Sequence, residues 1–176
     1  MSALPCHLAL QPDTVTRILL VSPRQGDRIS LRQIFKRSNW ILEEMATSRE
    51  TLGFLQKYPL PVVICARDLS DGNWEQFIAS ASRLPCPPRT IVASHSAGDD
   101  DDLWSEALKL GAYDVISAPF EATSVVTAIY FAWTSWEFEM RGQRGAVLVR
   151  PWRPRRNLAG LFLIARSRST ECGESA

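Results

Sequence analysis

The stretch LPVVICARDLSDGNW, residues 60–74, contains the transition that decides the fold. A continuous apolar run ends at Ala66, and an acidic turn follows it. Short continuous apolar runs are typical of strands that are buried on both faces of a sheet. The sequence Asp71-Gly72-Asn73 favours a turn, and apolar residues recur at helical spacing from Trp74 onward. The stretch therefore predicts a buried strand, a loop and an amphipathic helix.

The same strand and helix pattern recurs along most of the chain. Apolar runs predict strands at residues 17–22, 39–46, 60–66, 89–94 and 113–117. Apolar residues at helical spacing predict helices at residues 27–38, 48–58, 73–84, 101–112 and 121–140. Because parallel strands need crossover connections, this alternation predicts a doubly wound α/β fold, with a five-stranded parallel sheet covered by helices on both faces.

Sites in doubly wound folds lie beyond the carboxyl ends of the strands. The predicted strand ends direct attention to four places, namely Ser22–Pro23, Ala66–Asp71, Ser94–His95 and Ser117–Pro119. Four scattered cysteines without a C-x-x-C pair and only two histidines give no zinc-binding pattern. We therefore expect neither a metal nor another cofactor.

Composition and charge divide the chain into three parts. With 45% hydrophobic and 22% charged residues, the chain has a globular composition and no apolar run long enough to cross a membrane. The amino-terminal residues lack a secretory signal pattern, so we expect a cytoplasmic protein. The organisation predicted is an amino-terminal lead at residues 1–15, one domain at 16–140 and a carboxyl-terminal extension at 141–176.

The extension is strongly basic, whereas the rest of the chain is acidic. Residues 141–176 contain eight arginines and two glutamates, and the whole chain has a net charge of +1. A loosely ordered extension is one interpretation. Arginines around a tryptophan also suit phosphates and unpaired bases. The residues predicted to bind a polyanion are Arg150, Trp152, Arg153, Arg155 and Arg156.

Four segments carry a family resemblance: ILLVSP, VVICARDLSDG, TIVAS and ALKLGAYDVISAPF. In order and spacing they resemble the receiver domain of bacterial response regulators, over about residues 16–138. The resemblance implies a flavodoxin-like (βα)5 fold and a role in two-component signalling or a phosphorelay. In that family, two carboxylates after strand one hold Mg²⁺, an aspartate at the end of strand three accepts a phosphoryl group, and a lysine precedes the proline after strand five.

This sequence departs from the family at nearly all of these positions. Ser22 and Pro23 replace the acidic pair, Ala66 replaces the acceptor, and Ala118 replaces the lysine before Pro119, whereas Ser94 keeps the hydroxyl. Mg²⁺ prefers oxygen ligands, and phosphoryl transfer needs charge neutralisation. We therefore expect a vestigial phosphorylation pocket, no Mg²⁺ and no enzymatic activity.

The loop after residue 66 leaves one alternative open. Asp68 could accept a phosphoryl group if the alignment were shifted, although it lies two residues past the strand end. We expect Asp71 to belong to a turn and to cap the helix that follows, and His95 to be an ordinary pocket or surface histidine.

The last predicted helix is richer in aromatic residues than one buried stripe requires. Val125, Ile129, Trp133 and Trp136 recur at helical spacing, and Tyr130, Phe131 and Phe138 are additional. A broadly covered core helix is one interpretation, and a surface for a partner or a second copy is the other. In the family, position 115 carries an aromatic switch residue, which is valine here. The candidate interface consists of Val115, Tyr130, Trp133 and Trp136.

These expectations lead to one functional hypothesis with two alternatives. The hypothesis is a receiver-like signalling domain that acts by protein–protein interaction and without phosphorylation. The first alternative is a regulator associated with nucleic acid through the arginine-rich extension. The second is a residual phosphoacceptor domain that uses Asp68.

Overall fold

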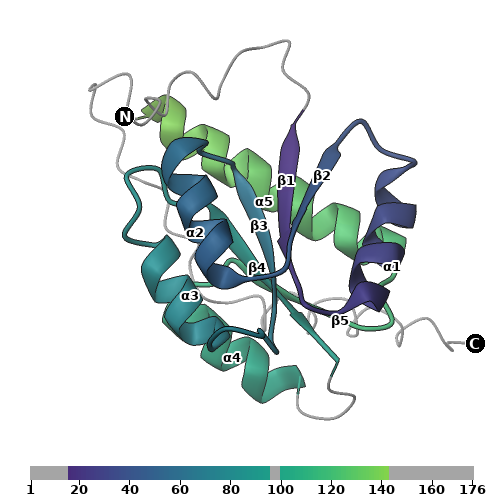
Figure 1. The fold of residues 1–176 in the computed structure, drawn as a ribbon. Helices are drawn as coiled ribbons and strands as arrows, with labels where there is room; N and C mark the ends of the chain where they lie inside the picture. The colour runs from purple at the N-terminus through teal and green to yellow at the C-terminus, as the bar shows by residue number, and fades with distance from the viewer. Residues whose placement is uncertain (1–15, 96–99, 143–176) are drawn as a thin grey trace, which may run out of the picture. The chain divides into compact units, whose positions relative to one another are not determined.

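The computed structural model describes residues 16–95 and 100–142. Five strands and five helices alternate in these residues (Figure 1). In chain order they are β1 (Arg17–Val21), α1 (Gln25–Phe35), β2 (Ile41–Met45), α2 (Ser48–Lys57), β3 (Val62–Ala66), α3 (Trp74–Ala81), β4 (Arg89–Ser94), α4 (Asp100–Leu110), β5 (Asp114–Ser117) and α5 (Ala122–Gly142). Every predicted element is present.

The strands form one parallel sheet in the order β2-β1-β3-β4-β5. Successive side chains of a strand point to opposite faces, so β1 contributes Leu19 and Val21 to one hydrophobic cluster and Ile18 and Leu20 to the other. Helices α2, α3 and α4 cover the first cluster, and α1 and α5 cover the second. The doubly wound α/β fold is confirmed.

The structure locates the carboxyl-terminal ends of α4 and α5. Gly111 follows α4 with a φ of +101°, which a residue with a Cβ rarely adopts, so a glycine suits this helix end. Helix α5 continues to Gly142, two residues beyond residue 140, where the sequence pattern placed its end.

Helix α5 packs on the sheet through a narrower face than its sequence suggests. Its buried residues are Val125, Ala128, Ile129, Ala132, Trp136 and Met140. Trp136 is 1% exposed, and its indole Nε1 donates a hydrogen bond to the Pro87 carbonyl oxygen at 3.0 Å. Tyr130, Phe131 and Phe138 are exposed. The broadly covered core helix is therefore not what α5 forms, because these three aromatic side chains lie outside the core.

Among the described residues, no helix combines the length and apolar character needed to cross a bilayer.

Candidate functional site

The carboxyl ends of β1, β3, β4 and β5 bring the predicted pocket residues to one edge of the sheet. Ser22, Ala66 and Ser94 are all buried there. Pairing of Ser94 with Ser117 sets the register of β4 and β5, and the Ala118 amide donates to the Ser94 carbonyl oxygen at 2.8 Å. Pro119 follows in an exposed position and Pro23 is exposed beside Ser22. The six pocket positions predicted from the sequence therefore lie at the carboxyl-terminal edge of the sheet.

Asp27 is a site residue that sequence reasoning missed. Its side chain is 3% exposed and lies in the first turn of α1. The Ser22 hydroxyl donates to Asp27 Oδ2 at 2.7 Å, and His95 Nε2 lies 2.9 Å from Asp27 Oδ1. The signal was present in the sequence, because Asp27 precedes the buried Leu31 and Phe35 at helical spacing and so belongs to the buried face.

His95 lies in the pocket and contacts two other elements of the edge. It satisfies a buried carboxylate, and its ring also packs edge-on against Phe120, with ring centroids 5.8 Å apart. A buried carboxylate without partners would be costly. The contact therefore joins the end of β4 to α1 and to the segment after β5.

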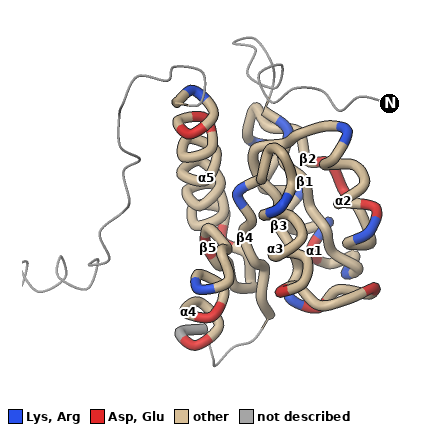
Figure 2. Tube along the Cα trace, turned by 90° about the vertical axis from the view of Figure 1, so that its left-hand side faces the viewer, with Lys and Arg blue, Asp and Glu red and all other residues tan. Residues whose placement is uncertain are grey.

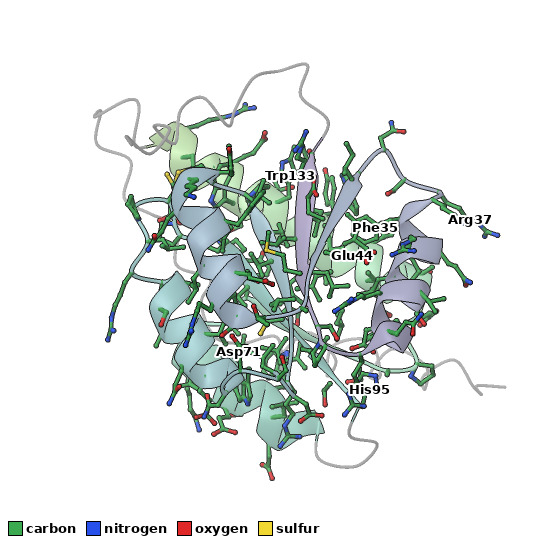
Figure 3. All side chains as sticks on the ribbon, in the orientation of Figure 1. Phe35, Arg37, Glu44, Asp71, His95 and Trp133 are labelled. Atoms are coloured by element: carbon green, nitrogen blue, oxygen red, sulfur yellow. The ribbon has the colours of Figure 1, made fainter. Side chains whose placement is uncertain are left out.

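Two arginines form hydrogen bonds with Ser22 at this edge of the sheet, which Figure 3 shows near His95. The Arg28 guanidinium donates to the Ser22 carbonyl oxygen from Nε at 3.0 Å and from Nη2 at 2.6 Å. The Arg24 amide donates to Ser22 Oγ at 3.1 Å, and its guanidinium pairs with Asp68. The Asp68 side chain is 63% exposed, so this ion pair lies on the outside of the edge.

The edge supplies hydrogen bonds but no nucleophile at the end of β3. Ala66 ends that strand with a methyl group. The preceding Cys65 is a buried free thiol, and its pKa is raised first by burial and second by the Asp71 carboxylate. A thiol held protonated is a poor nucleophile. Among the described residues, no group of three or more His, Cys, Asp or Glu side chains is placed to hold a metal ion.

Asp71 caps a helix, but not the one predicted (its position is labelled in Figure 3). Its carboxylate accepts hydrogen bonds from the Ser48 amide at 2.8 Å, the Ser48 hydroxyl at 2.9 Å and the Arg49 amide at 3.0 Å, all at the start of α2. The cap of α3 is Asn73, whose side chain accepts from the Gln76 amide. The expectation that Asp71 caps the helix after it is therefore wrong, because the loop before α3 lies against α2.

Replacing Asp71 with alanine is expected to lower the free energy of unfolding by about 1 kcal/mol, the usual loss for a helix cap. Desolvation raises the pKa of Asp71, but the hydrogen bonds from Ser48 and Arg49 lower it by more, so the net shift is downward. The contribution is therefore fully present above the ordinary carboxyl pKa and is lost as pH falls through the lower folded value. Urea unfolding at neutral and acid pH measures both effects.

Asp68→Ala is the matched control, because it removes the same charge from the same loop. Its ion pair with Arg24 is exposed, so we expect a change within about 0.5 kcal/mol. Equal losses in the two variants would contradict the capping role of Asp71.

The candidate interface residues do not share one environment. Val115 is half-buried on the edge strand, Tyr130 is 50% exposed, and Trp133 is half-buried against the α1 and α5 cluster. Trp136 is buried, so its assignment to an interface is wrong. The predicted polyanion-binding residues Arg150, Trp152, Arg153, Arg155 and Arg156 lie outside the described residues.

No protein-family model matches the sequence. Protein CcdB of Bacillus subtilis (strain 168) is 29% identical over 115 residues, which cover 65% of this chain and 95% of that protein.

Several solved structures with the same fold are receiver domains. The signal receiver domain of a putative Luxo repressor protein from Vibrio parahaemolyticus matches with a TM-score of 0.65 and 21% identity over 73% of this chain and 97% of its own. A CheY-like receiver domain protein from Methanospirillum hungatei JF-1 matches with a TM-score of 0.62 and 21% identity, over 72% and 99%. The beryllofluoride-activated NtrC4 receiver domain dimer matches with a TM-score of 0.60 and 23% identity, over 68% and 98%. These likenesses identify the fold as that of a response-regulator receiver domain.

Proposed function

We propose that this chain is a receiver-like signalling domain of the bacterial cytoplasm, which acts through protein–protein contacts and does not depend on phosphorylation. The observation that carries the proposal is the composition of the strand edge. Ala66 ends β3, Ser22 and Pro23 follow β1, and Ala118 follows β5. The domain is not an enzyme in this proposal, because the edge offers no acceptor at the end of β3.

The remaining polar groups at the edge are already engaged. Both carboxylate oxygens of Asp27 have partners, namely Ser22 and His95. Magnesium-dependent phosphoryl transfer needs oxygen ligands for the metal and cations or donors for the equatorial oxygens of the phosphoryl group. Binding Mg²⁺ through Asp27 would break contacts that offset the cost of burying this carboxylate. A structural role for Asp27 is therefore favoured.

Incubation with a small phosphodonor and Mg²⁺ is expected to leave the wild-type chain unmodified, as measured by intact mass spectrometry. Ala66→Asp is expected to remain unmodified as well. That substitution returns a carboxylate to the end of β3, but it restores neither the acidic pair at Ser22 and Pro23 nor the cation at Ala118. Each such electrostatic loss typically costs several kcal/mol of transition-state stabilisation.

A receiver domain with an intact acceptor serves as the positive control for the phosphodonor. One phosphoryl group mapped to Asp68 of the wild-type chain would establish the residual phosphoacceptor alternative instead. One mapped to position 66 of the variant would show that the missing residues matter less than proposed.

Two observations support interaction as the mode of action. The exposed aromatic residues of α5 are available to a partner, and the NtrC4 receiver domain among the structural neighbours is a dimer. Exposed apolar patches on soluble proteins commonly mark interaction sites.

The charge of the extension supports a second candidate function. Eight arginines against two glutamates in residues 141–176 favour attraction to a polyanion, so the extension is proposed to associate the domain with nucleic acid.

A further inference from the structure

One exposed face of α5 carries a repeat that the buried core does not use. Ser124, Thr127, Phe131, Thr134, Phe138 and Arg141 follow one another at alternating intervals of three and four residues, and all are exposed. We call this set the α5 seam. Phe131 is 56% exposed and Phe138 is 65% exposed. Spacing that averages 3.5 residues is the repeat by which two helices pack along their length.

Large and small side chains alternate along the α5 seam. Each phenylalanine is preceded by a threonine, in the order Thr127, Phe131, Thr134, Phe138, and Phe131 is also followed by one. The hydroxyl of Thr134 already donates to the Tyr130 carbonyl oxygen at 2.7 Å. An apolar group that covers this threonine therefore leaves the hydroxyl proton with its partner. A partner with the complementary alternation would fill the spaces above the threonines with its own large side chains.

We propose that the partner is a second copy of this chain, whose α5 packs antiparallel against the α5 seam. A twofold axis then places Phe131 against Thr134 of the second copy and Phe138 against Thr127 of the second copy. Each large side chain meets a small one, and Arg141 meets Ser124 at either end. The alternation is therefore self-complementary in this orientation, as a twofold interface requires.

The parallel orientation lacks this complementarity. It would place phenylalanine on phenylalanine and threonine on threonine, which leaves alternate layers overfilled and underfilled. It would also bring the two Arg141 side chains together. The helix spans 21 residues, or about 31 Å at 1.5 Å per residue, so the antiparallel orientation holds these arginines far apart.

The charges beside the α5 seam permit close approach of two copies. Glu137 pairs with Arg141 at 3.4 Å, and Glu139 pairs with Arg89. Glu121 accepts a hydrogen bond from the Ser124 hydroxyl at 3.2 Å. The carboxylates that flank the α5 seam are thus each engaged within their own chain, which limits repulsion between the copies. Figure 2 shows α5 standing at one side of the sheet.

The experiment measures the dimer dissociation constant of the full chain by sedimentation. Thr127→Lys and Phe138→Asp are each expected to weaken dimerisation at least about tenfold, because each places an unpaired charge in a packed layer of the interface. The double variant is expected to recover most of that loss, because the introduced lysine of one copy faces the introduced carboxylate of the other only in the antiparallel orientation. Both positions are exposed, and unchanged circular dichroism confirms that the variants fold.

Val126→Asp is the matched control on the same helix. Val126 is 37% exposed and lies outside the α5 seam, beside a groove of about 420 Å³ between α1 and α5. We expect it to leave dimerisation unchanged. A wild-type chain that stays monomeric into the hundreds-of-micromolar range overturns the proposal. So does a double variant weaker than both single ones, or dissociation by Val126→Asp alone.

This inference rests on the interaction role proposed above, but the two can fail separately. A phosphoryl adduct on the wild-type chain would contradict independence from phosphorylation and leave the α5 pairing intact. A monomer that takes up no phosphoryl group would contradict the α5 pairing and leave the interaction role to a different partner.

Discussion

Trp136→Ala is expected to lower the free energy of unfolding by about 3–5 kcal/mol, the range for truncating a buried tryptophan. Trp136 is 1% exposed, and its indole donates to the Pro87 carbonyl oxygen at 3.0 Å. The substitution would leave a cavity beneath α5 and would deprive a carbonyl group of its partner. Urea unfolding followed by circular dichroism measures the loss.

Trp133→Ala on the same helix is the matched control. Trp133 is only half-buried and packs at the margin of the α1 and α5 cluster, so we expect a smaller loss of roughly 1–2 kcal/mol. Equal losses in the two variants, or a larger loss for Trp133→Ala, would contradict the division between buried and exposed faces of α5.

Replacing Arg150, Arg153, Arg155 and Arg156 together with glutamine is expected to weaken binding to nucleic acid at low salt by at least about hundredfold. Each arginine that neutralises a phosphate releases a condensed counterion, so the slope of log affinity against log salt should also become shallower. Trp152 is retained, so the variant tests the arginine charges alone. Fluorescence anisotropy of a labelled oligonucleotide over a series of salt concentrations measures both quantities.

The matched control removes four positive charges from the described domain. Arg37, Arg49, Lys57 and Arg83 are exposed, and replacing them with glutamine should change the affinity far less. Similar losses in the two variants would show that net charge, not the extension, governs binding. A wild-type chain that does not bind would remove the nucleic-acid candidate.

The order of the elements could be predicted from the sequence because it depends on local patterns. Continuous apolar runs such as residues 62–66 have no polar face, so they fit a strand that is covered on both sides. Gly111 could be recognised as a helix end for a similar reason, since its positive φ is cheap for glycine alone. The replacement of the acidic pair, acceptor and lysine is a prediction from the resemblance, because it compares residue types at matching positions.

Partners across the fold could not be read in this way. Asp27 and His95 lie far apart in the chain, and their contact exists because the sheet brings α1 and the end of β4 to one edge. Asp71 looked like a cap for the helix that follows it, but its carboxylate lies within hydrogen-bond distance of α2 amides instead. A capping side chain needs only a nearby free N–H, and sequence order does not say which helix start is nearest.

The sequence alone determined the class of fold, whereas the tertiary structure decided which face of α5 is buried. Ala128, Ala132 and Trp136 lie on the buried face of α5, and small side chains such as alanine let a helix approach a sheet closely. Phe131 and Phe138 lie on the exposed face. Helical periodicity gives the angles between side chains on one helix, but it does not give the helix's rotation toward the sheet, which depends on how side chains from distant segments pack together.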